Sequence, residues 1–128
     1  YTPGAKFIDG TGATKPAEVV ERPEITDECS IQAVLYEAKD AEGNEVILTG
    51  HDINTSAYRV AAAVLADGTA KAAYTYFDIT FTYVNGKTYE AGKEYKLAIV
   101  CSSSKEGDSF KGAGGSTLWI DELEIIGE

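Results

Sequence analysis

The amino-acid sequence predicts an all-β domain, an antiparallel β-sandwich or jelly roll with roughly six strands. Three observations support this prediction. Short runs rich in β-branched and aromatic residues recur along the chain, and several of them alternate between apolar and polar side chains. Glycine, asparagine and aspartate separate these runs, as turns between strands require. Short strands at regular spacing are typical of sandwiches and jelly rolls.

Composition and charge exclude several classes of function. The chain has 128 residues, of which 44% are hydrophobic and 25% charged, and this balance is typical of a globular domain. Its net charge of −10 would repel a phosphate backbone, so nucleic acid is not an expected partner. No apolar run approaches the roughly 20 residues that a bilayer helix needs, so the chain is not expected to span a membrane.

Residues 1–24 are predicted to form an irregular N-terminal segment or linker, and residues 25–128 the β-sandwich domain. Proline and glycine interrupt regular backbone structure. Because the chain starts at Tyr1 without a basic and apolar leader, we expect a mature product or a piece of a longer parent. The residues that predict irregularity are Pro3, Gly4, Gly10, Gly12, Pro16 and Pro23.

Four strands are predicted in the middle of the chain. Residues 29–35 and 95–101 each carry an apolar row, and both rows are expected to face a core. Residues 60–65 are apolar on both faces, which favours a central strand over the helix that their alanines also permit. Residues 77–84 alternate most regularly. Tight turns are predicted at Asn85-Gly86 and Ala91-Gly92.

The last predicted strand, residues 118–125, allows two registers. Without a bulge, Trp119 and Asp121 lie on the same face as Leu123 and Ile125, and the Asp121 carboxylate would then need hydrogen bonds or a cation. With a bulge near Asp121-Glu122, the apolar side chains point inward while Trp119 and Asp121 point outward.

The sequence from residue 101 to 125 resembles the closing signature of the putative carbohydrate metabolism domain (PCMD) family. The matching positions are the serine triplet 102–104, Gly107-Asp108, Phe110, Gly112-Ala113 and Gly115-Ser116-Thr117-Leu118. Residues 1–4, 27–29 and 33–37 also resemble this family, so the similarity covers nearly the whole chain.

This resemblance implies a galactose-binding-like jelly roll from exported bacterial proteins, often lipoproteins, that take part in glycan use. It places the protein at the cell surface, in the outer membrane or in the periplasm. Because family members extend further at the N-terminus, the chain is expected to be the C-terminal portion of the family domain, with other domains of the same parent as partners. The family supplies no catalytic residues to transfer. Similar jelly rolls carry a structural Ca²⁺, which makes Asp121 a candidate metal ligand.

A sugar ring presents an apolar face of C–H groups flanked by hydroxyls, so its binding site combines an exposed aromatic plane with hydrogen-bonding side chains. Aromatic and polar residues coincide in a few places in this sequence. The candidate ligand-binding residues are Asn54 with Tyr58 and Arg59, Tyr74 with Tyr76, Asp108 with Phe110 on the rim of a glycine-rich loop, and Trp119.

Other chemistry has weak support in the sequence. The single imidazole, His51, lies in a Gly-His-Asp turn, and no base is identified beside either cysteine, so nucleophilic catalysis is not expected. The loop 107–116 lacks the Gly-Lys-Ser/Thr ending of a phosphate-binding loop. Cys29 and Cys101 both fall on apolar rows and are interpreted as core-facing sulfurs, either two reduced thiols or a disulfide.

Taken together, these features predict a non-catalytic carbohydrate-binding domain of an exported or cell-surface protein. A structural or adhesive module that binds protein partners is the first alternative. A glycoside hydrolase domain is the second, because 21 acidic residues leave room for the carboxylate pair that this chemistry needs.

Overall fold

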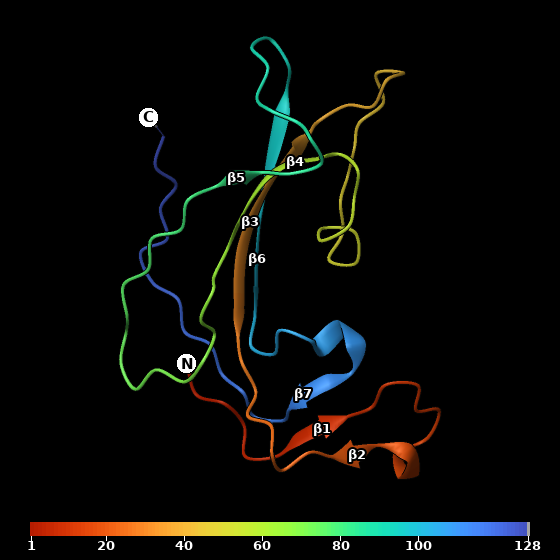
Figure 1. Cartoon of the computed structure of the whole chain (residues 1–128), viewed down its shortest axis with the longest axis vertical. Coiled ribbons are helices and arrows are strands. Elements are labelled where there is room, and N and C mark those ends of the chain that lie inside the picture. Colours follow the sequence, from red (N-terminus) through yellow and green to blue (C-terminus); the bar gives the residue numbers. More distant parts are fainter. Residues whose placement is uncertain (128) are drawn as a thin grey trace. The chain divides into compact units, whose positions relative to one another are not determined.

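The computed structural model describes residues 1–127 and confirms the all-β prediction. Its regular elements are seven short strands and two single-turn 3₁₀ helices, with no α-helix among the described residues. The strands form two antiparallel sheets, which agrees with the predicted all-β class (Figure 1). Within the same residues, no helix is long and apolar enough to cross a bilayer.

The chain forms two compact units, each with one sheet. The first unit comprises Tyr1–Cys29, Gly68–Phe77 and Ser102–Glu128, and the second comprises Ser30–Asp67 and Asp78–Cys101. The first unit holds β1 (Phe7–Asp9), η1 (Pro16–Glu18), β2 (Val20–Glu21), η2 (Gly107–Ser109) and β7 (Lys111–Ala113). The strands β3 (Ser30–Glu37), β4 (Arg59–Val64), β5 (Thr82–Tyr83) and β6 (Tyr95–Ser102) form the other sheet.

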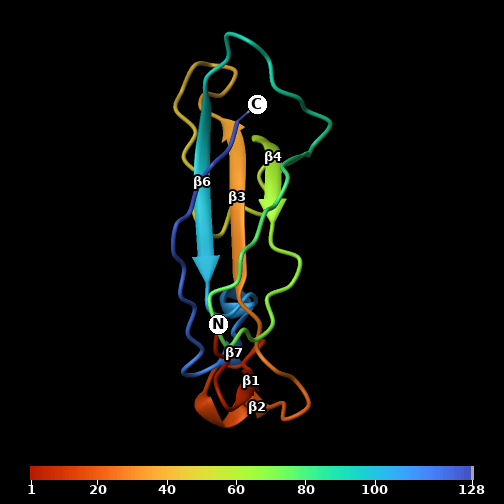
Figure 2. The ribbon, with the colours of Figure 1, turned by 90° about the vertical axis from the view of Figure 1, so that its left-hand side faces the viewer.

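The sheet of the second unit has the order β5-β4-β3-β6, and neighbouring long strands run in opposite directions (Figure 2). Ala62 of β4 lies opposite Val34 of β3 and Thr82 of β5. Val34 and Ala62 pack with Ile53, which comes from the turn before β4, to form the buried centre of this unit. The small alanine side chains of β4 allow this close packing, and the helical alternative for this segment is wrong.

Both predicted turns are confirmed. Asn85 and Gly86 have φ angles of 58° and 65°, the left-handed values that a type I′ hairpin turn needs at both central positions. The Lys87 amide closes this turn with a 3.1 Å hydrogen bond to the Val84 carbonyl. Gly92, with a φ of 88°, forms the turn that precedes β6.

The predicted strand at residues 77–84 is confirmed only at Thr82–Tyr83. The predicted alternation of buried and exposed side chains is present in residues 77–81. Phe77, Ile79 and Phe81 are half-buried, while the side chains between them are exposed. Residues 77–81 make no backbone hydrogen bond to another segment of the described chain, so side-chain periodicity alone does not create a ladder here.

β6 forms as predicted, but it turns its other face to the core. Ala98 and Val100 pack against the buried centre, whereas Leu97 and Ile99 are 43% and 39% exposed. Both faces of this strand are apolar, so the pattern did not determine which one is buried. Cys101 shares the exposed row, and its prediction as a core-facing sulfur is wrong.

The two cysteines are both thiols, with Cys29 buried and Cys101 exposed. Desolvation raises the pKa of the Cys101 thiol, which lowers its thiolate fraction near neutral pH.

We expect iodoacetamide to modify Cys101 in the native protein, more slowly than it modifies free cysteine, and to reach Cys29 only after unfolding in urea. Mass spectrometry of peptides from native and unfolded samples measures both rates. Equal modification of the two thiols in the native protein would contradict this assignment.

The first unit corrects the prediction that residues 1–24 are irregular. β1 pairs with β2 and with β7 (Figure 1). In the second of these pairs, Phe7 lies opposite Ala113. The glycines and prolines of residues 1–24 lie outside β1 and β2, and Pro16 begins η1, a position where its missing N–H is harmless. The predicted domain boundary at residue 25 stays a prediction.

No strand forms at residues 118–127, so neither predicted register of a final strand is realised. Trp119 is 67% exposed, while Leu118 and Ile120 are half-buried. For residues 118–120 this is the facing that the bulged alternative predicted. Glu122 has a φ of 51°, which interrupts the extended run. Beyond it, Leu123 and Ile125 are nearly half exposed.

Candidate functional site

A buried carboxylate organises the first unit. Asp27 is 2% exposed, and its Oδ2 accepts hydrogen bonds from the Ser104 and Ser116 hydroxyls at 2.5 and 2.6 Å and from the Ala113 amide at 3.0 Å. Its Oδ1 accepts a further bond from the Glu28 amide. A buried charge is tolerated when it is hydrogen-bonded in this way. Asp27 therefore fastens the serine triplet and the glycine-rich loop to one another within the first unit.

The glycines of this region allow close backbone approach. A Cβ at Gly112 would meet the Ser104 hydroxyl at 2.7 Å, and one at Gly4 would overlap the Gly114 carbonyl. The Gly4 amide donates to the Ser116 hydroxyl at 2.9 Å. The residues that carry the family resemblance thus have packing and hydrogen-bonding roles around Asp27, and sequence reasoning had not singled out that acid.

An open groove of about 610 Å³ lies on the same unit. Phe110 at its wall is 73% exposed and adopts a φ of 59°, an uncommon value for a residue with a bulky side chain. Its carbonyl accepts from the Gly10 amide at 2.8 Å, which fixes this conformation. Most of the lining is apolar or glycine, and it includes Ile8, Ala13, Pro16, Val19, Phe110 and Ala113.

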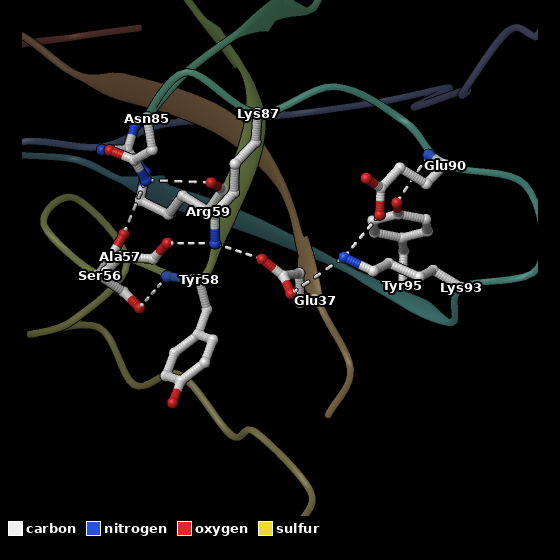
Figure 3. Close-up of polar contacts among 10 residues, drawn as sticks. All are labelled: Glu37, Ser56, Ala57, Tyr58, Arg59, Asn85, Lys87, Glu90, Lys93 and Tyr95. Carbon is white, nitrogen blue, oxygen red and sulfur yellow. Dashed lines mark hydrogen bonds and ion pairs between the residues drawn. The ribbon is translucent and has the colours of Figure 1, made fainter. Parts of the chain in front are cut away.

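The second unit carries a network of ion pairs that links β3 to the two turns before β6 (Figure 3). Glu37 accepts from the Lys87 ammonium and lies 3.8 Å from that of Lys93. Lys93 also binds Glu90 at 2.6 Å, and this hydrogen bond holds the pKa of Lys93 above its ordinary value. The Glu90 amide in turn donates to the Tyr95 hydroxyl. The network holds both turns against the end of the sheet.

Tyr58 projects beside this network (Figure 3). The Lys87 ammonium lies 5.8 Å from the centre of its ring and donates to the Ala57 carbonyl at 2.7 Å. Next to it, Arg59 donates to the Asn54 carbonyl at 2.5 Å, and the Asn85 side chain donates to the carbonyls of Ser56 and Arg59. We call Tyr58, Lys87, Arg59, Asn54 and Asn85 the tyrosine platform.

The tyrosine platform has unused polar groups. Tyr58 is 37% exposed, and no residue within 1–127 hydrogen-bonds to its hydroxyl. The Arg59 Nε atom is buried and has no partner among the described residues. The arrangement thus combines an aromatic plane, held in place by its neighbours, with polar groups around it.

Comparison with known families identifies the chain. Residues 1–126 match the family described as "Putative carbohydrate metabolism domain". The chain belongs to this PCMD family. Among curated proteins there is no match.

Two solved structures resemble this PCMD chain. One is described as a putative glycoside hydrolase from Bacteroides thetaiotaomicron VPI-5482, with 33% identity and a TM-score of 0.69. The other is described as a putative glycoside hydrolase from Bacteroides vulgatus ATCC 8482, with 32% identity and a TM-score of 0.64. Each similarity covers 88% of the PCMD chain, which spans 31% and 43% of the respective relatives.

The structure of the PCMD chain brings some of the predicted residues together. Asn54, Tyr58 and Arg59 meet in the tyrosine platform, and Phe110 lines the groove. Asp108 lies on η2 and does not line the groove. The other three aromatic candidates are exposed and belong to the first unit: Tyr74, Tyr76 and Trp119.

Sequence reasoning missed Glu37, Lys87 and Asn85, which complete the tyrosine platform and its support. Asn85 had been recognised only as a turn residue, although its side chain bridges back to β4. His51 is exposed in a turn, as predicted. Glu37 is the one charged residue of β3, at its end. This position indicates a role only when its partners, Lys87 and Lys93 of the later turns, are known.

Asp121 does not gain a set of metal ligands. Its Oδ1 accepts from the Glu122 amide at 2.9 Å, and no group of three or more His, Cys, Asp or Glu side chains within residues 1–127 is placed to hold a metal ion. Its role as a calcium ligand stays a prediction.

Proposed function

We propose that this PCMD chain is a non-catalytic carbohydrate-binding domain and that the tyrosine platform is its glycan contact. The observation that carries the proposal is the partly exposed Tyr58 ring, which lies beside the Lys87 ammonium while its backbone amide donates to the Ser56 hydroxyl and its own hydroxyl has no hydrogen-bond partner within residues 1–127. Membership of a family described by carbohydrate metabolism supports the class of ligand.

The surroundings of Tyr58 match what a sugar requires. The ring can stack on the C–H face of a pyranose, while the Tyr58 hydroxyl and the exposed Asn54 side chain offer hydrogen bonds to its hydroxyls. Neither group is hydrogen-bonded within the described residues. The ion pair of Glu37 with Lys87 holds in place the lysine that lies beside the ring, so a ligand would have to immobilise less of this side chain on binding.

Hydrolysis is the second candidate function, and the descriptions of the two structural relatives favour it. A glycosidase needs two carboxyl groups on either side of the scissile bond. Of the acids near the tyrosine platform, Glu37 and Glu90 are both engaged with lysine side chains. Release of product sugar that disappears with Glu37→Gln would select this function over binding alone.

The proposal predicts that Tyr58→Ala weakens binding of the best glycan from an array screen. Loss of the stacked ring should reduce the binding free energy by about 1 to 3 kcal/mol, while Tyr58→Phe should lose only the hydroxyl contribution. Isothermal titration calorimetry measures both variants. The thermal melting of each must remain close to that of the parent protein.

Tyr76→Ala is the matched control, because Tyr76 is 84% exposed and belongs to the other unit. It should bind with unchanged affinity. Full affinity in Tyr58→Ala, or loss in Tyr76→Ala instead, would place the contact outside the tyrosine platform and contradict the proposal. If no glycan on the array binds and a protein partner binds saturably, the chain is a structural or adhesive module instead.

The finer features expected from the family are part of this proposal. We propose a galactose-binding-like jelly roll that forms the C-terminal portion of the family domain. The parent protein is proposed to be exported to the cell surface, outer membrane or periplasm of a bacterium, where other domains of the same chain are its partners. Fractionation of cells that express the parent protein tests its location.

A further inference from the structure

The groove on the first unit differs in charge from the rest of the molecule. The whole chain carries a net charge of −10, yet no aspartate or glutamate is among the residues that line this groove. Its two charged lining residues are Lys15 and Lys111. In an acidic protein, a concave surface whose charged groups are all cations favours an anionic ligand.

The two lysines are only weakly engaged by acids. Lys15 lies 4.0 Å from Glu18, a pair that is mostly exposed and therefore weak. Lys111 has no acid within ion-pair distance among the described residues. Its strand partner Asp9 accepts from the Thr11 amide at 3.0 Å, and the hydrogen bonds from Thr11 lower the pKa of Asp9 more than the charge of Lys111 does. Both ammonium groups thus remain available to a ligand.

Phe110 adds an aromatic plane to these cations. Its ring is 73% exposed at the wall of the groove, and its backbone is pinned by the 3.1 Å bond from its own amide to the Gly107 carbonyl as well as by Gly10. Residues held in sparsely populated backbone regions often serve a binding role, since the surrounding structure must maintain them. The volume of about 610 Å³ lies in the range of small-ligand sites.

We infer that this groove is a second binding site, one that takes a sugar ring bearing a carboxylate or sulfate group. The ring lies against Phe110, and the anionic group binds Lys111 and Lys15. The inference rests on the carbohydrate role proposed above, but it involves none of the residues of the tyrosine platform.

The test compares methyl glucuronide with methyl glucoside, which differ by the carboxylate, and adds glucose sulfate to distinguish the two anionic groups. NMR titration should show that an anionic sugar shifts the amides of Phe110, Lys111 and Gly112, and that its affinity falls as salt rises. Lys111→Gln should weaken this binding about tenfold, which corresponds to one charge-assisted hydrogen bond. Lys15→Gln should weaken it in the same direction.

Lys39→Gln is the matched control, because it removes the same charge from an exposed pair with Glu94 in the second unit. It should leave the titration unchanged, and Tyr58→Ala should leave it unchanged as well. Equal binding of glucoside and glucuronide, equal loss in Lys39→Gln, or no anion-dependent shift in the groove would each overturn the inference. In none of these cases would glycan binding that depends on Tyr58 be affected, so the two proposals fail separately.

Discussion

Replacing Asp27 by asparagine is expected to lower the free energy of unfolding by about 3 kcal/mol, since an amide cannot accept all the bonds that the carboxylate accepts. Oδ2 of this buried side chain receives two hydroxyls and one backbone amide. Asparagine would place an N–H₂ group or a neutral oxygen there, and at least one buried donor would lose its partner. Urea denaturation followed by circular dichroism measures the change.

Asp78→Asn is the control for this substitution. Asp78 is exposed, and removing its charge should change the unfolding free energy by no more than about 0.5 kcal/mol. If Asp27→Asn were as stable as this control, Asp27 would not fasten the signature segments together. Ser116→Ala offers a milder version, because it removes one of the three bonds to Oδ2 and the acceptor of the Gly4 amide and should lose about 2 kcal/mol.

Ile53→Ala is expected to destabilise the protein by about 3 kcal/mol through the cavity that it leaves. Ile53 is 2% exposed and packs with Val34 and Ala62 at the centre of the second unit. Its neighbour Ala62 on β4 is too short to fill the space. Ile53→Val should lose about 1 kcal/mol, since most of the side-chain volume remains.

Ile47→Ala makes the same chemical change at a side chain that is 69% exposed. It should alter the unfolding free energy by less than about 0.5 kcal/mol. Similar losses for the two isoleucines in urea denaturation would mean that Ile53 is not at a packed centre.

The positions of turns and long strands could be predicted from the sequence. Asn85-Gly86 is a local signal, because few dipeptides tolerate two successive left-handed conformations. β3, β4 and β6 were found because eight or fewer residues of suitable pattern are enough to define a strand. The short strands β1 and β2 were missed because they are only three and two residues long and lie among turn-forming residues.

The facing of β6 and the role of Asp27 depend on tertiary contacts, which a pattern does not contain. Leu97 and Ile99 are more hydrophobic than Ala98, yet the smaller residue faces the core because it packs against side chains from β3 and β4. An aspartate that precedes a strand is usually solvated, and only the later serines reveal that this one is buried. The sequence predicted only part of the tyrosine platform for the same reason. Tyr58 and Arg59 are adjacent in sequence, whereas Lys87 reaches them only through the fold.

The bonds to Asp27 also constrain the order of events during synthesis. Its partners Ser104, Ala113 and Ser116 lie 77, 86 and 89 residues later in the chain. Closing loops of this length is slow compared with forming a hairpin, and the set of bonds cannot be complete until the last partner has left the ribosome. The Asp27 carboxylate therefore stays hydrated in the nascent chain while the whole second unit is synthesised. A chain cut short before Ser116 would be a ready substrate for proteases.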